Sequence, residues 1–265
     1  LTGAPQFHDQ NFSQNRSVYE QYGNKYNPNS GFLDGQRYTE RRNYYHKPVA
    51  NLNWDYEIND KVDLSAVLYA SWGRGGGTGG LGAGRVRFSD DTDMARSMID
   101  FETIRSNNQA TADANGYGNF GDSYIRRSSV NNHNWYGFLG NLNYDANENW
   151  DLSVGVDARM YTGDHFRQVN DLLGLNGWVD NFRNDNRPDD YTFTEEYDAN
   201  PWSALFNSAD EDNRTQYDYS ESINYIGAFG QAEYATDHFS AFFQGAVSTQ
   251  SFQRTGRFTG AERDG

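Results

Sequence analysis

The sequence has 265 residues, no Cys and a formal net charge of −15, from 37 acidic and 22 basic side chains. So acidic a chain is a poor candidate for binding nucleic acid, and the lack of Cys excludes disulfides, zinc–thiolate sites and cysteine nucleophiles. No stretch supplies the roughly 20 apolar residues of a membrane-spanning helix, and 19 Tyr, 17 Phe and 6 Trp are too many aromatic residues for a disordered chain.

The first long element predicted along the chain is a hairpin over residues 43–73. Apolar side chains alternate with polar ones from Ala50 to Ile58, and the alternation resumes from Val62 to Trp72. A two-residue period over about a dozen residues on each side of a turn indicates two long antiparallel strands with one apolar face. Upstream of this hairpin, we interpret residues 17–26 and 31–38 as strand ends or as a loop hairpin.

The same alternation predicts two more hairpins, over residues 133–161 and 223–250. The predicted turns are residues 58–61, 145–149 and 235–238, and each has the short length usual for a hairpin. Parity assigns one set of side chains to the apolar face: Leu52, Trp54, Leu64, Leu68, Leu142, Val154 and Val156. It assigns another set to the polar face: Asn53, Asp55, Asn143, Asp157 and Arg159.

Two long polar segments, residues 74–132 and 162–216, connect the hairpins. Within residues 90–110 a short helix is expected, because four apolar side chains fall on or near one helical face: Met94, Met98, Phe101 and Ile104. The run "GRGGGTGGLGAG" at residues 73–84 lacks the lysine of a phosphate-binding loop and the βαβ context of a dinucleotide site. We therefore expect it to let a loop fold back across the interior.

The contrast between short turns and long loops is typical of one architecture. A transmembrane β-barrel has long strands that are apolar outside and polar inside, with short turns at one end and long extracellular loops at the other. Aromatic residues flank its apolar band, as Trp54 and Tyr144 do beside the short turns here, and Trp72 and Trp135 towards the long loops. The predicted fold is therefore an all-β, antiparallel transmembrane barrel. A soluble β-sandwich, whose strands also alternate, is the alternative.

Several segments resemble TonB-dependent outer-membrane receptors of the Bacteroidota. The segments "YYHKPVANLNWDYEINDKVDLSAVLYASWGRGGGTG" (44–79), "SSVNNHNWYGFLGNLNYDANENWDLSVGVDARMYTGDHFRQVNDLLG" (128–174) and "YIGAFGQAEYATDHFSAFFQGAVSTQSFQRTGRF" (225–258) are similar to barrel strands of that family. The opening "LTGAPQFHDQNF" resembles an extracellular loop that precedes the first of those strands. The resemblance covers nearly the whole chain and does not identify a substrate.

The resemblance implies a barrel of twenty-two strands that encloses a plug domain, with a TonB box near the mature N-terminus. The plug and the TonB box have no counterpart in these residues, so residues 1–265 are expected to be part of the barrel. The implied function is to bind a nutrient (an oligosaccharide, a peptide or a metal chelate) at the extracellular loops and to import it into the periplasm. The implied location is the cell outer membrane. The implied partners are outer-membrane lipids, the TonB–ExbB–ExbD complex, a surface lipoprotein and the nutrient itself.

Ligand-binding residues are expected where the strands leave the membrane. The candidates there are Trp72, Arg74, Arg159, Tyr161, His165 and Arg167, with Gln6 and His8 in the preceding loop. Rings at such positions can stack on a sugar or peptide, and guanidiniums can bind carboxylates. No enzymatic activity is predicted. Two alternatives stay open: a secreted β-rich carbohydrate-binding or hydrolytic domain, and a passive porin-like barrel.

A calcium loop is the one metal site that the sequence suggests. Asp113, Asn115, Asn119 and Asp122 have spacings near those of such a loop. The first position is Thr111 rather than Asp, however, and a final bidentate Glu is missing. A structural calcium ion and an uncoordinated turn are both compatible with this pattern. No other cofactor is predicted, and the five His residues show no metal-binding spacing.

Overall fold

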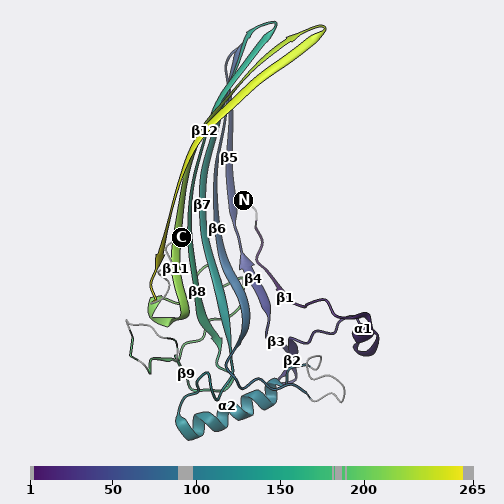
Figure 1. Ribbon diagram of the computed structural model, residues 1–265, viewed down its shortest axis with the longest axis vertical. Helices are drawn as coiled ribbons and strands as arrows, with labels where there is room; N and C mark the ends of the chain where they lie inside the picture. The colour runs from purple at the N-terminus through teal and green to yellow at the C-terminus, as the bar shows by residue number, and fades with distance from the viewer. Residues whose placement is uncertain (1–2, 89–97, 181, 183–186, 189, 259–265) are drawn as a thin grey trace.

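The structure, a computed structural model, describes residues 3–88, 98–180, 182, 187, 188 and 190–258. An eight-stranded antiparallel sheet dominates these residues (Figure 1). Its strands are β1 (Gln6–Asp9), β4 (Arg42–His46), β5 (Val49–Asn59), β6 (Val62–Leu81), β7 (Ile125–Asn147), β8 (Trp150–Asp171), β11 (Arg214–Thr236) and β12 (Phe239–Gly256). The order across the sheet is β1-β4-β6-β7-β8-β11-β12, and β5 also pairs with β6.

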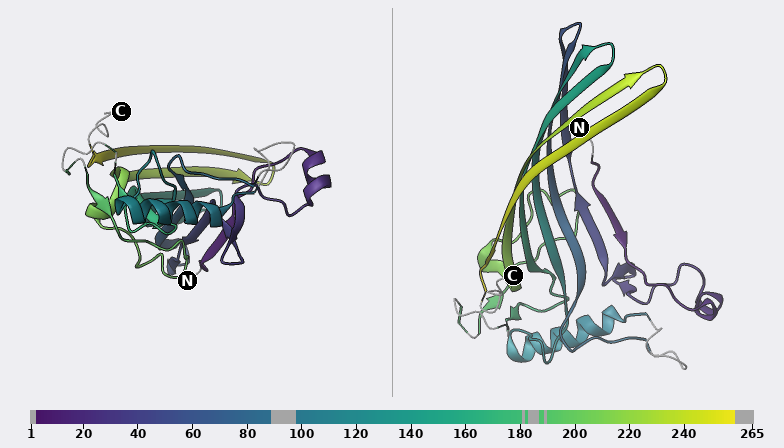
Figure 2. Two further views of the ribbon diagram at one scale, coloured as in Figure 1. Left: turned by 90° about the horizontal axis from the view of Figure 1, so that it is seen from below. Right: turned by 45° about the horizontal axis from the view of Figure 1, so that its top comes forward.

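The smaller elements lie towards the end of the sheet that is opposite the short turns (Figures 1 and 2). They are α1 (Arg16–Tyr22), β2 (Ser30–Leu33), β3 (Gln36–Thr39), α2 (Phe101–Asn115), β9 (Trp178–Val179), β10 (Thr192–Phe193) and a 3-10 helix, η1 (Glu211–Asn213). The pairs β2–β3 and β9–β10 each form a separate two-stranded sheet. Neither α-helix in the described part of the chain has the length and hydrophobicity that crossing a bilayer requires.

The fold class predicted from the alternation is confirmed as predominantly antiparallel β. Long hairpins pair β5 with β6, β7 with β8, and β11 with β12, and all three turns lie at one end of the molecule (Figure 1). The described residues do not form a closed barrel. Instead β12 pairs only with β11, and at the opposite side β1 and β5 are the outermost strands.

The predicted boundaries of the long loops were wrong. Residues 74–81 and 125–132 belong to β6 and β7, whose ladder resumes from Gly76 opposite Val130, and residues 162–171 continue β8. The connections are therefore residues 82–124 and 172–213 rather than 74–132 and 162–216. The prediction failed because the alternation of apolar and polar residues ends near Trp72 and Tyr161, whereas the backbone pairing of the strands continues beyond these residues.

The glycine-rich run is likewise a strand rather than a folded-back loop. Residues 73–81 complete β6 and pair with β7 on one side, while residues 74–77 pair with β4 on the other. Glycine in a strand often marks the close approach of another group. Here the backbones of β4 and β7 closely approach Gly75 and Gly76, whereas side chains such as His133, Asn43 and Arg127 lie next to Gly73, Gly77 and Gly79.

The predicted helix is present, but it begins later than its apolar pattern suggested. Asp100 caps α2, because its side chain accepts a hydrogen bond from the backbone N–H of Thr103. Phe101 and Ile104 are buried as expected, Met98 precedes the helix, and Met94 lies outside the described residues. Upstream, residues 31–38 contain the β2–β3 hairpin as one alternative predicted, whereas the expectation for residues 17–26 was wrong because they contain most of α1.

The long hairpins have two faces, which we name by their side chains. The apolar face holds the row Leu52–Leu68–Phe138–Ala158–Ile226, in which each residue is the register partner of the next. The polar face holds the row Asn53–Val67–Leu139–Asp157–Gly227. The parity prediction is confirmed in the sense that the two predicted sets occupy opposite faces.

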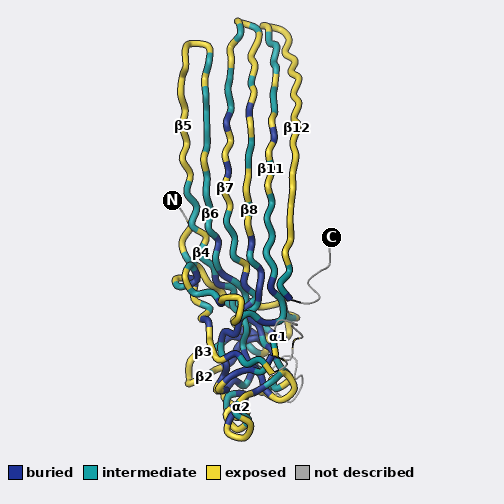
Figure 3. The backbone as a smooth tube through the Cα atoms, turned by 90° about the vertical axis from the view of Figure 1, so that its left-hand side faces the viewer, coloured by how far each residue is buried: buried dark blue, intermediate teal, exposed yellow. Residues whose placement is uncertain are grey.

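The packed core lies at the loop end of the molecule rather than on the long hairpins (Figure 3). One cluster gathers residues of α2, the loop ends of β6, β7 and β8, and the second connection: Leu81, Ala112, Ile125, Val169, Leu172, Leu175, Trp178 and Phe193. Large side chains on the apolar face of the hairpins stay exposed, for example Leu68 at 52% and Val154 at 55%. The core therefore orders the loops and leaves the apolar face uncovered.

Candidate functional site

A groove floored by glycine runs along the polar face at the loop end of β6. Gly73, Gly75, Gly77 and Gly79 occupy alternate positions of the strand and therefore share one face. The side chains of Asn43, Tyr45 and Lys47 border this floor from the β4 side, and those of β7 border it from the other. We call this feature the glycine groove; part of it is a pocket of about 270 Å³.

Five rings form a continuous series beside the groove, which we call the ring band: Trp135, Tyr161, His133, His165 and Tyr219. Successive ring centroids are separated by 5.1, 5.6, 5.6 and 4.8 Å. Register explains the series, because Trp135 pairs with Tyr161 and His165 pairs with Tyr219 across neighbouring strands. Gly163 leaves room for it, since a Cβ there would come within 2.4 Å of the Tyr161 hydroxyl.

Hydrogen bonds fix the two imidazoles of the ring band. His133 Nδ1 and the Tyr161 hydroxyl are 2.7 Å apart, and His165 Nδ1 donates to Asn131 Oδ1 at 2.7 Å. Burial lowers the pKa of His133, and the neighbouring His165 lowers it further. Burial also lowers the pKa of His165, while Glu221, whose Oε1 lies 2.9 Å from His165 Nε2, opposes this shift. In both rings burial therefore favours the neutral form of the imidazole.

Cationic side chains flank the ring band on both sides. Lys47 reaches the space above Gly73, where the His133 ring also lies. On β12 the Arg254 guanidinium carbon lies 3.9 Å from the centroid of the Tyr219 ring, a close cation–π contact. Although the chain as a whole is strongly acidic, this part of the polar face is rich in positive charge.

Two more arginines lie at the loop end of the same face. Arg127 donates to Ser129 Oγ at 3.1 Å, and Arg167 donates to the same hydroxyl at 3.3 Å. Arg167 also donates to Gln216 Oε1 at 2.5 Å and lies over the Tyr217 ring. The pKa of Arg127 falls to about 10, first because the side chain is buried and then because Arg167 is near.

The structure brings together only some of the candidates predicted from sequence. Tyr161 and His165 belong to the ring band, and Arg167 lies next to it on the polar face. Arg159 is on the same face, closer to the short turns, where its Nε donates to Asp157 Oδ1 at 3.0 Å.

Gln6 and His8 lie in β1 at the edge of the sheet, beyond the glycine groove. The Tyr45 hydroxyl donates to Gln6 Oε1 at 2.6 Å, and the Asn43 amide nitrogen lies 3.2 Å from His8 Nε2. Both therefore contact the side chains that border the groove. They belong to a strand rather than to the open loop that the sequence suggested.

Trp72 and Arg74 are placed differently from the prediction. The Trp72 indole N–H donates to the Tyr136 hydroxyl at 3.1 Å, on the apolar face. The Arg74 guanidinium donates to the carbonyls of Gly73 and His133, each at 2.8 Å. The structure thus puts Trp72 on the other side of the sheet from the ring band, and it uses Arg74 to hold two strands.

Six residues of the site were missed as ligand-binding candidates: Lys47, Arg127, His133, Trp135, Tyr219 and Arg254. The prediction ended the strands too early, so their shared face was not recognised. The signal that could have found this site is the alternation of glycines from Gly73 to Gly79, which marks one face of a strand as free of side chains.

The calcium pattern is not gathered into one loop. Asp113 and Asn115 belong to the last turn of α2. Asn119 and Asp122 bind one another instead, with Asn119 Nδ2 donating to Asp122 Oδ2 at 2.6 Å. In the described part of the chain, no group of three or more His, Asp or Glu side chains is placed to hold a metal ion.

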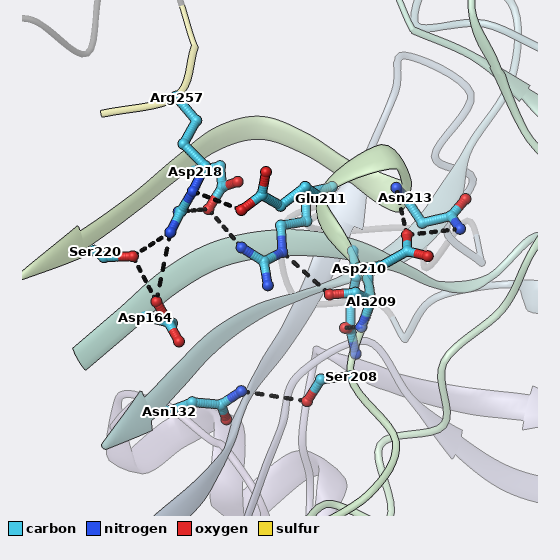
Figure 4. A network of polar contacts seen from close by, with 12 residues as sticks. Asn132, Asp164, Ser208, Ala209, Asp210, Glu211, Asn213, Asp218, Ser220 and Arg257 are labelled. Atoms are coloured by element: carbon cyan, nitrogen blue, oxygen red, sulfur yellow. Dashed lines mark hydrogen bonds and ion pairs between the residues drawn. The ribbon is translucent and has the colours of Figure 1, made fainter. Parts of the chain in front are cut away.

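A separate polar network fastens the loop end of β11 to the chain that follows β12 (Figure 4). The carboxylate of Asp218 accepts from Arg257 at 2.6 Å and from Arg214 at 2.9 Å. Burial raises the pKa of Asp218, and the two guanidiniums oppose the shift. Arg257 also pairs with Glu211 at 3.0 Å, so this network joins β11, η1 and the end of β12. Its role is structural.

The site on the polar face can bind and orient a polar ligand. Flat rings stack on apolar faces of sugars or peptides, amides supply hydrogen bonds, and the surrounding cations attract negative charge. Neither a scan against protein-family models nor a search of curated proteins finds a match for this chain.

Proposed function

We propose that this chain is part of the wall of a TonB-dependent outer-membrane receptor, which binds a nutrient on its polar face and passes it to the periplasm. In this proposal the strands span the membrane from the short turns to about Trp72, Trp135 and Tyr161. The ring band and the glycine groove lie just outside the membrane. The ligand is an oligosaccharide, a peptide or a metal chelate.

The observation that carries the proposal is the exposed apolar face of the long hairpins. Its large side chains include Leu52 at 64% exposure, Met160 at 59% and Val247 at 74%. An apolar surface that continuous usually marks a membrane or protein interface. A secreted soluble domain would cover such a face with a second sheet or with helices, whereas here the helices and smaller sheets pack at the loop end (Figure 1).

The open edges support the same proposal. A sheet edge leaves backbone N–H and C=O groups unpaired, which a bilayer does not tolerate. We therefore propose that further strands of a longer protein continue the sheet beyond β5 and β12 and close it, to a barrel of about twenty-two strands. A plug, and coupling to the TonB–ExbB–ExbD complex, would distinguish this receptor from a passive porin.

Site-directed spin labelling tests the membrane orientation. Because the chain has no Cys, a label can be placed singly at Val154→Cys on the apolar face or at its neighbour Ser153→Cys on the polar face. In lipid bilayers the label at residue 154 should collide mainly with dissolved oxygen, and the label at residue 153 with a water-soluble nickel complex. Equal accessibility of both labels to the nickel complex would rule out a lipid-facing surface.

A further inference from the structure

The strongest unexplained feature of the polar face is a pair of buried or half-buried cations without carboxylate partners. In the described part of the chain, the ion pairs of the other loop-end arginines include Arg85 with Glu40 and Arg214 with Asp218. Arg127 and Arg167 have no such ion pair among these residues. Both instead share the hydroxyl of Ser129, and the Nε atom of Arg127 is buried without a hydrogen-bond partner.

Placing two guanidiniums so close together costs energy, since like charges repel more strongly away from water. Arg41 adds a third positive charge near Arg127, and the carboxylate of Glu40, which also acts on Arg127, is shared among Arg41, Arg85 and Tyr124. With its pKa lowered only to about 10, Arg127 remains charged at pH 7. In the described part of the chain, neither arginine of this pair forms an ion pair with a carboxylate that would balance its charge.

The glycine floor extends to this pair. The Arg127 guanidinium lies over Gly79, where a Cβ would be 3.1 Å from its terminal nitrogens. Along the same floor, Gly77 adjoins Asn43, and Gly73 lies below Lys47 and His133. Lys47, Asn43 and Arg127 therefore lie in this order along one face of β6, from the ring band towards the arginine pair.

We infer that Arg127 and Arg167 form a subsite for an anionic group, so that the ligand carries a carboxylate, sulfate or phosphate. Guanidiniums bind such groups through paired, charge-assisted hydrogen bonds. The ring band binds the flat or apolar part of the ligand while the arginine pair binds its negative end. This inference rests on the proposed function, whose ligand class it narrows from any polar nutrient to an anionic one.

Citrate, with maltotriose as a neutral control, is a suitable probe. Titration calorimetry on the longer protein in lipid nanodiscs should show citrate binding that weakens as salt increases. Arg127→Gln and Arg167→Gln should each weaken it roughly tenfold or more, the usual effect of losing a hydrogen bond to a charged group. Arg167→Lys, which keeps the charge but not the fork of donors, should give an intermediate affinity. Maltotriose binding should be unaffected by all three changes.

Arg16→Gln is the matched control, because it removes the same charge from an exposed side chain of α1. If Arg127→Gln prevents folding, Arg167→Gln carries the test. Unchanged citrate affinity in Arg167→Gln, or an equal loss in Arg16→Gln, would overturn the inference. Citrate binding to the isolated chain but not to the longer protein would also overturn the inference. In that case a carboxylate from another part of the longer protein would occupy the arginine pair in place of a ligand.

The two proposals can fail separately. If citrate does not bind while the spin labels report a lipid-facing residue 154, the anion subsite is wrong and the receptor proposal stands. If citrate binds and depends on both arginines while residue 154 faces water, the subsite is real and the membrane proposal is wrong.

Discussion

His165 shows how a single side chain depends on contacts from several strands. Its ring stacks on Tyr219 with an interplanar angle of 20°, its Nδ1 donates to Asn131, and its Nε2 faces Glu221. Asp164 and Arg254 also act on it, raising and lowering its pKa respectively. Burial outweighs the acidic neighbours, so the folded-state pKa lies below the ordinary value of 6.5.

Removing the charge of Glu221 should move this pKa further down. In Glu221→Gln the carboxylate that favours the imidazolium is gone, so burial acts with less opposition. With a lower pKa for His165, the folded variant binds fewer protons than its unfolded chain over a wider pH range below 6.5 than the unsubstituted protein does. This titration should leave the stability of the variant unaffected above pH 6.5. On acidification, its stability should fall more steeply than that of the unsubstituted protein. NMR titration of the His165 ring, with chemical unfolding at pH 8 and pH 5, measures both effects.

Glu20→Gln is the control for this experiment, since Glu20 is an exposed residue of α1 paired with Arg16. It should leave the His165 titration unchanged. A raised or constant pKa of His165 in Glu221→Gln would show that Glu221 does not stabilise the charged ring.

At the scale of elements, β6 combines two functions in one strand. From Val62 to Trp72 it presents alternating side chains to the two faces, and from Gly73 to Gly79 it becomes the floor of a groove. The strand pairs with β7 in both parts and keeps the same register, although Arg74 and Gly75 have no partners in β7 at the junction. The two parts therefore differ in side-chain size and are separated by a short interruption in the pairing.

The orientation of β6 leads to a sharp prediction about two adjacent residues. Leu68 lies on the apolar face about midway between the short turn and Trp72, whereas Val67 lies on the polar face. If the apolar face contacts lipid, Leu68→Arg should destabilise the folded protein by about 2–4 kcal/mol. Val67→Arg should cost much less, because its guanidinium would extend into the hydrated interior.

Urea-dependent folding into lipid vesicles measures this difference. The two variants have the same net charge and lie on the same strand, so charge and strand propensity are matched. Costs that are equal, or larger for Val67→Arg, would argue that the apolar face is covered by protein or exposed to water.

At the scale of the whole molecule, the described residues form an incomplete surface. The loop end has a packed core built around Phe101, Ile104 and Trp178, but the long hairpins lean outward without any layer against them (Figures 2 and 3). Strand β12 is exposed along almost its full length. Under the proposed function, lipid on one face and further strands at the edges supply the contacts that this sheet lacks.

Amide hydrogen exchange can test whether β12 is an internal strand of a larger barrel. In this chain alone, the N–H groups of β12 that point away from β11 should exchange quickly, while those bonded to β11 are protected. In the longer protein both sets should be slow, because a further strand pairs with the outer edge. The central strands β7 and β8 should be protected in both samples and serve as the internal reference. Fast exchange of the outer set in the longer protein would place β12 at a true edge.

The alternation from Ala50 to Ile58 and from Val62 to Trp72 determined by itself the long strands, the turns and the two faces. Successive side chains of an extended strand point to opposite sides, so a polarity period of two predicts a strand with one apolar and one polar face. The end of each strand was not determined in this way. Beyond Trp72 the sequence consists of glycine and polar residues, and it takes the partners β4 and β7 to keep residues 73–81 extended.

The site was decided almost entirely by tertiary structure. Tyr161 and His165 were predicted from their positions near the ends of the inferred strands. Trp72 also lies near the end of an inferred strand, yet its side chain is on the opposite face of the sheet. Arg127 and Arg167 are far apart in the chain and meet only because the register of β7 and β8 sets Arg167 opposite Ser129. Local polarity specifies which face a residue occupies. Which residues become neighbours on that face depends on strand register, which depends on pairing across the whole sheet.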